Sequence, residues 1–275
     1  MSSRAQSVVS NGQSHTQRIC PYAEVLYAHP PYKQFGEMVK VLVGPEKKEF
    51  KVHTGLISHH SSWFRSACEG AGPQNEDGVT KTIKLPDDEP EVFEAVLTWI
   101  YTRKFSEKLE ACQLKSRFLY RIYIFADKRG VPALKVRVID ALFDKNGSLH
   151  YDSIAHVYEH TKRGSGLRKF LVHAVMYKHG IKNLVERKGE DEILKVLPAE
   201  FLLDYSVMAE QLVEDPSWAT LEWSDFNRCD YHEHPTKTDE KPEVSFADDE
   251  SDFRRSVSIR GKRPQLSRDY SSSVL

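Results

Sequence analysis

Apolar residues recur periodically from about Phe35 to Phe226 of this 275-residue chain. There they recur with the spacing of strands and helices, and turn residues separate the periodic segments. The first 17 residues are rich in Ser, Gln and Asn, and the residues after Asp230 are dominated by charge. Such segments bury too little apolar surface to offset the entropy cost of ordering. The sequence therefore predicts a folded centre between two disordered tails.

The overall charge favours no class of charged partner, because 39 Lys and Arg oppose 40 Asp and Glu and leave a net charge of -1. The net charges of two blocks in the C-terminal tail nearly cancel each other. Residues 230–252 hold nine acidic and two basic residues, and residues 253–268 hold six basic and no acidic ones. The basic block is interpreted either as a solvated tail or as a nuclear import address or phosphate contact. We expect no nucleic-acid partner and no membrane partner.

The expected compartment is the inside of a cell, in the cytoplasm or the nucleus. No apolar stretch approaches the roughly 20 residues that span a bilayer, and the N-terminal residues lack the apolar centre of a secretory signal. The cysteines are scattered, without a C-x-x-C pair, at Cys20, Cys68, Cys112 and Cys229. We expect them to be free thiols in a reducing compartment.

Three strands are predicted in the first half of the folded centre. β-branched residues indicate a strand over 38–43, which Gly44 and Pro45 end, and alternating charged and apolar residues indicate a second over 49–52. These two are expected to pair as a hairpin. A third strand is predicted over 82–85, after a loop over 70–78.

Helix starts are predicted where a side chain that can cap a helix precedes an apolar periodic run. Thr54 and either Ser61 or Ser62 are expected to cap two short helices, and Asp88 with Glu91 has the form of a capping box. The remaining signals are Pro90 in a first turn, a helix from Leu114 to Ala126, a left-handed Gly130 before Pro132, a cap at Asp152, and helices over 167–178, 191–197 and 198–213.

Five blocks of sequence carry a specific likeness to one known domain. They are Val39-Lys40-Val41-Leu42-Val43, then Phe50-x-Val52-His53-x-x-Leu56-Ile57-Ser58-x-x-Ser61-x-x-Phe64, then Ile83-x-Leu85-Pro86-Asp87-Asp88-x-Pro90-x-Val92-Phe93, then Leu97-x-Trp99-Ile100-Tyr101-Thr102, and last Leu119-Tyr120-x-x-Tyr123-x-Phe125-Ala126-Asp127-Lys128-x-Gly130-Val131-Pro132-x-Leu134-Lys135. In order and spacing they resemble the BTB/POZ domain. The last two blocks, with a continuation through Val157-Tyr158-Glu159-x-Thr161 and Leu167-Arg168, are similar to fungal BTB-domain proteins.

The resemblance implies an α+β fold, in which a small β-sheet is flanked by helical hairpins and followed by an all-α C-terminal extension. The expected domains are a disordered or weakly ordered segment (1–33), a BTB/POZ domain (34–145), a helical extension (146–228) and a disordered charged tail (229–275). The resemblance also implies a protein–protein interaction scaffold or adaptor, often a homodimer, with no catalysis and no cofactor.

Residues that could suggest chemistry within the domain are expected to serve its structure. His53, Trp99, Tyr101 and Asp127 each lie where packing, capping or bracing of a hairpin corner explains them. We therefore assign no catalytic, cofactor or metal residue to the domain.

Two departures from the family pattern bear on the partner. BTB domains usually carry Asp just before the first strand, where this chain has Glu37. Members that recruit cullin ubiquitin ligases typically place an apolar-x-Glu motif in the loop after the second helix of the first pair. Here Glu76 is present but Gln74 stands at the apolar position. A substrate adaptor of a cullin ubiquitin ligase is thus the alternative function, and its usual motif is incomplete.

One motif indicates a different class of protein. His156-Val157-Tyr158-Glu159-His160 fits H-x-x-E-H, in which two histidines one helical turn apart bind zinc and the glutamate acts as a general base. A zinc hydrolase that uses His156, Glu159 and His160 is therefore the remote alternative. The competing interpretation is an ordinary helix of the extension with Val157 and Tyr158 in the core.

A second group of potential ligands lies at the start of the acidic tail. Cys229, His232 and His234 fall within six residues, and no Cys or His follows them. A structural zinc site usually has four ligands, so the fourth would have to come from the folded body or a second chain. The competing interpretation is a junction segment that only packs on the extension.

Overall fold

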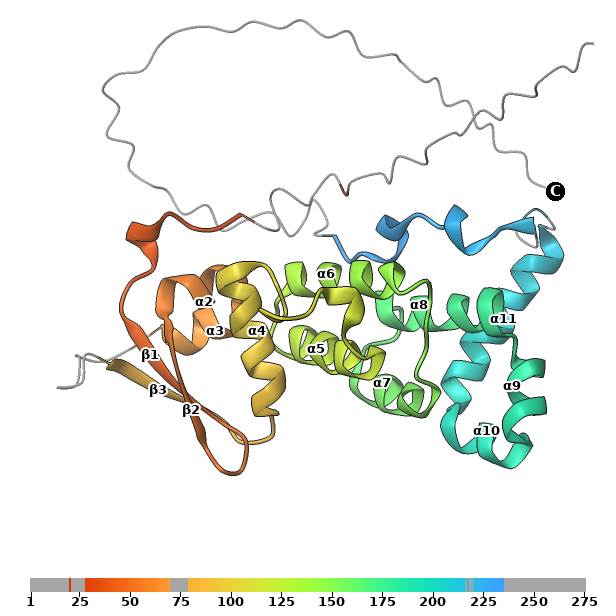
Figure 1. Ribbon diagram of the computed structural model, residues 1–275, viewed down its shortest axis with the longest axis horizontal. Helices are drawn as coiled ribbons and strands as arrows, with labels where there is room; N and C mark the ends of the chain where they lie inside the picture. The colour runs from red at the N-terminus through yellow and green to blue at the C-terminus, as the bar shows by residue number, and fades with distance from the viewer. Residues whose placement is uncertain (1–19, 21–27, 70–78, 216, 218–219, 235–275) are drawn as a thin grey trace, which may run out of the picture. The chain divides into compact units, whose positions relative to one another are not determined.

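The computed structural model describes residues 20, 28–69, 79–215, 217 and 220–234, and these belong to one compact unit that ends at His234. Its sheet has three strands in the order β2-β1-β3, with β1 (Met38–Val43) between β2 (Lys48–His53) and β3 (Val79–Leu85). β1 runs antiparallel to β2 and parallel to β3. The sheet lies at one end of the helical body in Figure 1.

The predicted hairpin is confirmed, because β1 and β2 pair along their whole length with Met38 opposite His53 and Val43 opposite Lys48. β1 places Val39, Val41 and Val43 in the core, at 0% exposure. This alternation is what a strand with one buried face requires. β3 begins three residues earlier than predicted, because its parallel pairing with β1 already starts opposite Met38.

Helices cover the sheet and extend away from it. The two short helices after β2 are α2 (Thr54–His60) and α3 (Ser62–Cys68), and α4 (Pro90–Thr102) follows β3. α5 (Ser116–Lys128) and α6 (Pro132–Asp144) form a hairpin whose corner is Gly130, with φ +59°. The left-handed Gly130 and a helix starting at Pro132 are confirmed. Short 3-10 turns η1 (Tyr32–Gln34) and η2 (Ala111–Gln113) precede β1 and α5.

The helical extension continues this stack (Figure 1). Its helices are α7 (Ile154–His160), α8 (Gly166–Ala174), α9 (Ile181–Lys188), α10 (Glu190–Val196) and α11 (Ala199–Glu214). The 3-10 turns η3 (Tyr151–Ser153), η6 (Trp223–Asp225) and η7 (Arg228–Tyr231) and a π-helical turn, η4 (Val175–His179), complete it. No helix among the described residues is long and apolar enough to cross a membrane.

Three predicted helix caps are wrong, because tertiary contacts use those side chains. Thr54 lies inside α2, and its hydroxyl donates to the carbonyl of Glu37 (3.0 Å). Asp88 pairs with Arg129, and Glu89 takes the N-cap position of α4. Asp152 pairs with Lys188 at 3.1 Å.

Of the two predicted alternatives, Ser61 and Ser62, Ser61 is the cap, since its hydroxyl accepts from the amide of Phe64 at 2.9 Å. α4 starts at Pro90, as predicted.

Two further differences concern the start of the predicted tail and one helix that the sequence does not predict. The predicted charged tail starts at residue 229, but η7 extends through Tyr231, whose side chain is 2% exposed. α9 was not predicted, because Leu184 is its only buried residue and leaves almost no periodic apolar signal. The predicted loop over 70–78 lies outside the described residues.

Candidate functional site

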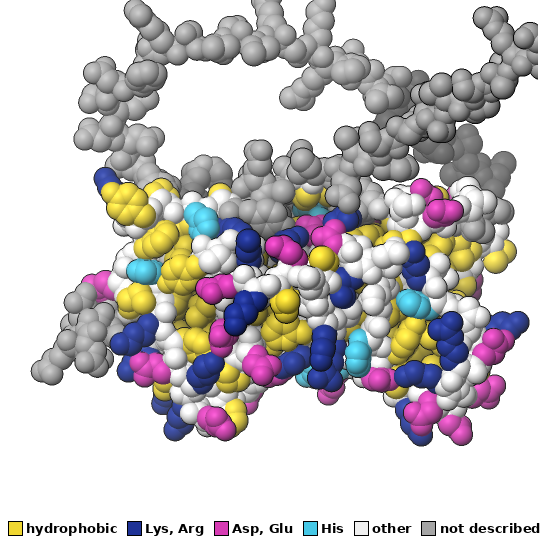
Figure 2. Space-filling view, in the orientation of Figure 1, with side chains coloured by type: hydrophobic (Ala, Val, Ile, Leu, Met, Phe, Trp, Pro, Cys, Tyr) yellow, Lys and Arg dark blue, Asp and Glu magenta, His cyan; other side chains and the backbone are white. Residues whose placement is uncertain are grey.

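A surface beside the sheet exposes aromatic side chains, and we call Tyr32, Phe35, His53 and Tyr101 the aromatic surface. Tyr32 is 76% and Tyr101 is 39% exposed. The rings of Phe35 and His53 lie 5.4 Å apart, and those of His53 and Tyr101 lie 6.0 Å apart. Figure 2 shows hydrophobic side chains gathered in this region, at the upper left of the described surface.

Hydrogen bonds and a close backbone approach hold the aromatic surface in place. The hydroxyl of Tyr101 accepts from the backbone amide of His53 (3.2 Å) and lies 2.8 Å from its Nδ1. The amide of Gly55 donates to the carbonyl of Phe35 at 2.7 Å. A Cβ at Gly55 would lie 1.7 Å from the carbonyl oxygen of Gln34, so only glycine permits this approach. These contacts fix Tyr101, His53 and the backbone at Phe35 relative to one another.

A buried histidine next to this surface fixes the chain before η1. Burial and the nearby Arg103 guanidinium lower the pKa of His60 to about 3, so its ring is neutral. Its Nε2 can then accept from Arg103 at 2.9 Å, and Arg103 donates a second bond to the carbonyl of Ala28 at 3.2 Å. His59 Nε2 also contacts that carbonyl, at 3.2 Å. Residue 28 is thereby tied to α2 and to the end of α4.

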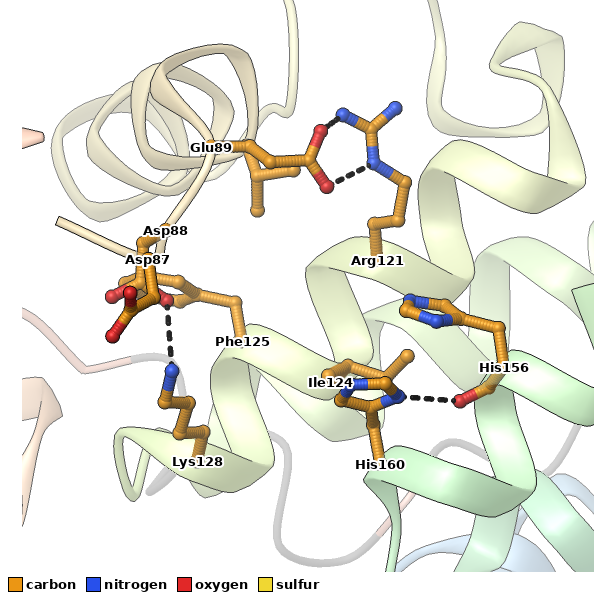
Figure 3. Close-up of a pocket in the computed structure, with 10 residues that line it drawn as sticks. Asp87, Asp88, Glu89, Arg121, Ile124, Phe125, Lys128, His156 and His160 are labelled. Atoms are coloured by element: carbon orange, nitrogen blue, oxygen red, sulfur yellow. Dashed lines mark hydrogen bonds and ion pairs between the residues drawn. The ribbon is translucent and has the colours of Figure 1, made fainter. Parts of the chain in front are cut away.

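A pocket of about 220 Å³ lies where the turn before α4 meets α5 and α7 (Figure 3). Glu89 pairs with Arg121, whose Nε donates to a carboxylate oxygen at 2.7 Å. On the opposite side of the pocket, Lys128 Nζ lies 3.6 Å from Asp88 Oδ1. The pocket is smaller than the roughly 300–1,000 Å³ of typical small-molecule sites.

Asp88, one of the residues that line the pocket, belongs to a buried ion pair that serves the fold. The carboxylate of Asp88, 7% exposed, pairs with Arg129, whose side chain is 10% exposed. The Arg129 guanidinium also lies 4.1 Å from the ring centre of Trp63. The backbone carbonyl of Arg129 accepts a hydrogen bond from the Ser61 hydroxyl at 2.5 Å. These contacts join the turn before α4 to the end of α5 and the start of α3.

The H-x-x-E-H motif forms a surface cluster on α7. The ligand atoms of His156, Glu159 and His160 lie within 4.8 Å of one another, and all three residues are exposed. His160 Nδ1 donates to the carbonyl of His156 at 2.9 Å, and both rings face the pocket (Figure 3). Burial lowers the pKa of His156. The motif thus places three potential ligands together, and the structure adds none from another described element.

The second predicted group comes together with a residue that the sequence did not connect to it. Cys229, His232 and His234 lie with Cys20, and their ligand atoms are all within 4.8 Å of one another. Burial and the neighbouring Cys20 thiol raise the pKa of Cys229 to about 11, and burial lowers the pKa of His234. No local pattern connects Cys20 to the other three, because 214 residues separate it from His234.

The remaining residues singled out in the sequence lie in structural contacts. Trp99 is fully buried, and Asp127 accepts from Lys135 at 2.6 Å. Glu37 is exposed before β1, and its carbonyl accepts from the amide of Thr54 at 2.8 Å. Gln74 and Glu76, of the incomplete cullin motif, lie outside the described residues.

The family model of the BTB/POZ domain matches residues 32–122, from η1 into α5. No curated protein matches the chain, so the similarity to fungal proteins stays a prediction. The mixed sheet and the many helices fit the α+β class expected from the sequence. Residues 32–122 of the chain are thus similar to the BTB/POZ domain.

Proposed function

We propose that this chain is a protein-interaction scaffold or adaptor that binds a second copy of itself through the aromatic surface. The observation that carries the general role is the BTB/POZ match at residues 32–122. The domain of this proposal spans residues 34–145, and residues 146–228 extend it with helices that present further surface.

The aromatic surface supports self-association for two physical reasons. Aromatic side chains bring much contact area at a low entropy cost and are enriched in the buried centres of interfaces. The hydrogen bonds of Tyr101 and the close approach at Gly55 hold Tyr101, His53 and the backbone at Phe35 in one conformation. A partner then loses less entropy on binding than it would against a mobile surface.

The alternative is a substrate adaptor of a cullin ubiquitin ligase, which uses the same class of domain. The sequence favours it less, because Gln74 replaces the apolar residue of the usual motif. A zinc hydrolase is not proposed, because its three residues are exposed positions of one helix of only seven residues. The two adaptor hypotheses differ in the partner that the domain captures.

Co-capture of two differently tagged full-length chains tests the proposal. Wild-type copies should capture each other, and Tyr32→Asp should reduce capture at least about tenfold by placing a charge in the buried centre. Leu109→Asp is the matched control, because Leu109 is 46% exposed but lies outside the aromatic surface. Equal capture by Tyr32→Asp, or equal loss in both variants, would contradict the proposed surface. Capture of a purified cullin without self-capture would favour the alternative.

A further inference from the structure

Two thiols and two imidazoles meet at the end of the helical extension, at Cys20, Cys229, His232 and His234. Their ligand atoms all lie within 4.8 Å of one another, and Cys20 Sγ lies 3.8 Å from His234 Nε2. In a tetrahedral zinc site, bonds of about 2.3 Å to sulfur and about 2.1 Å to nitrogen place neighbouring ligand atoms about 3.4–3.8 Å apart. The observed separation of Cys20 and His234 fits that geometry.

We propose that these four side chains bind one Zn²⁺ ion in a structural site that ties residue 20 to the end of the helical extension. Two thiolates and two imidazoles are a common ligand set of structural zinc. Four protein ligands leave no open position, so the ion serves the fold and not a reaction. On binding, each thiol gives its proton to solvent and the imidazoles bind as neutral rings.

The orientation of His232 points to a metal. Its side chain is 1% exposed, and its Nε2 lies 3.1 Å from Asp140 Oδ1. A carboxylate only accepts, so Nε2 carries a hydrogen, and in the neutral ring that binds a metal Nδ1 then offers a lone pair. That Nδ1 is buried and has no hydrogen-bond partner among the described residues. A buried acceptor without a partner is costly, whereas a carboxylate behind a histidine is the usual support of a zinc ligand.

The segment that carries three of the ligands is firmly held on α6 and α8. Glu233 pairs with Lys135 and accepts from the amide of Gly166 at 3.0 Å. The hydroxyl of Tyr231 lies 2.6 Å from His173 Nδ1. Ligands on such a segment are preorganised, which a tight metal site requires.

The cluster on α7 does not match these features. His160 and Glu159 have side chains that are 43% and 74% exposed, and His160 uses Nδ1 within its own helix. It offers no buried nitrogen aimed at a ligand. It therefore serves as an internal comparison in the metal experiment.

Metal analysis of the reduced full-length chain tests the proposal. After purification without added metal, plasma mass spectrometry should find about one zinc per chain. After chelation, Co²⁺ should restore an intense visible absorption of a tetrahedral ion with thiolate ligands. Failure to take up either ion, or a Cys20–Cys229 disulfide in protein from reducing extracts, would overturn the proposal.

Variants locate the ion. Cys229→Ser should lose the zinc, whereas Cys112→Ser, which removes an exposed thiol elsewhere, and His156→Ala should keep it. If Cys229→Ser does not fold, Asp140→Asn replaces it as the test, with an expected 10–100-fold weaker affinity for Zn²⁺. Zinc that persists in the variants of the proposed site, or that disappears in His156→Ala, would overturn the assignment.

Discussion

Gly166→Ala should detach the segment before His234 from the fold, because Gly166 allows a backbone approach that no other residue permits. A Cβ at this position would lie 1.9 Å from the carbonyl oxygen of Tyr231, and such contacts are essentially never closer than 3.0 Å. Either α8 or the segment must therefore move by at least about 1.1 Å, the difference between these two distances. The Tyr231 carbonyl has little room to retreat, because its ring is buried and hydrogen-bonded to His173.

The magnitude follows from the contacts that would be lost. Overpacking a fixed contact costs about 1–3 kcal/mol. Release of the Tyr231 ring from Phe143 and Phe170, at centroid distances of 5.0 and 6.4 Å, adds about 1.5–3 kcal/mol. Alanine offsets up to about 1 kcal/mol through its better helix propensity. We expect Gly166→Ala to lower the free energy of unfolding by about 1.5–6 kcal/mol.

Urea unfolding followed by tryptophan fluorescence measures this loss. Gly164→Ala is the control, because Gly164 has φ +76° but nothing within 4 Å of an added Cβ, so it should cost only about 1–2 kcal/mol of backbone strain. Glu233→Gln should destabilise the wild type but should have no effect in the Gly166→Ala background. In that background Glu233, on the displaced segment, no longer accepts the hydrogen bond from the Gly166 amide. A Gly166→Ala variant as stable as the wild type, or less affected than Gly164→Ala, would refute the reasoning.

Two further predictions concern buried charge. Asp88→Ala should lower the free energy of unfolding by about 3 kcal/mol or more, because it leaves the Arg129 guanidinium buried without its partner. Glu89→Ala is the control, because its ion pair is half-exposed. It should cost less than about 1 kcal/mol in the same urea titrations. Burial lowers the pKa of His60 to about 3 and that of His173 to about 4, so the folded protein binds fewer protons than the unfolded chain. Each histidine should lower the stability by roughly 2.5 kcal/mol as the pH drops from 7 to 4.5, which is roughly 5 kcal/mol for the two together. Side-chain NMR should find both rings neutral at pH 5, and a titration midpoint near 6.5 for either would contradict this.

Periodic apolar residues sufficed to predict most elements. β1, α4 and α6 follow from valines at every second position or from apolar residues one helical turn apart, and each buries those residues. Ser61 was predicted correctly as a cap because its hydrogen bond is local. Thr54 and Asp88 were not, because partners distant in sequence take their side chains.

Contacts between distant residues also limited the prediction of the sites. The sequence supplied three ligands of the proposed zinc site, but the fourth, Cys20, joins them only through the folded chain. The glycines at 55 and 166 carry no local signal of their close contacts with Gln34 and Tyr231. The aromatic surface was likewise not visible, since nothing in the sequence shows that Tyr32 and Tyr101 remain exposed.

The molar mass of the full-length chain in solution tests the central claim, self-association through the BTB/POZ domain, most directly. Sedimentation equilibrium over a range of concentrations should give twice the 31.6 kDa of one chain for the wild type. Tyr32→Asp should shift the mass toward that of one chain, and Leu109→Asp should not. A wild-type chain that remains at 31.6 kDa at every concentration up to the high micromolar range would contradict the account.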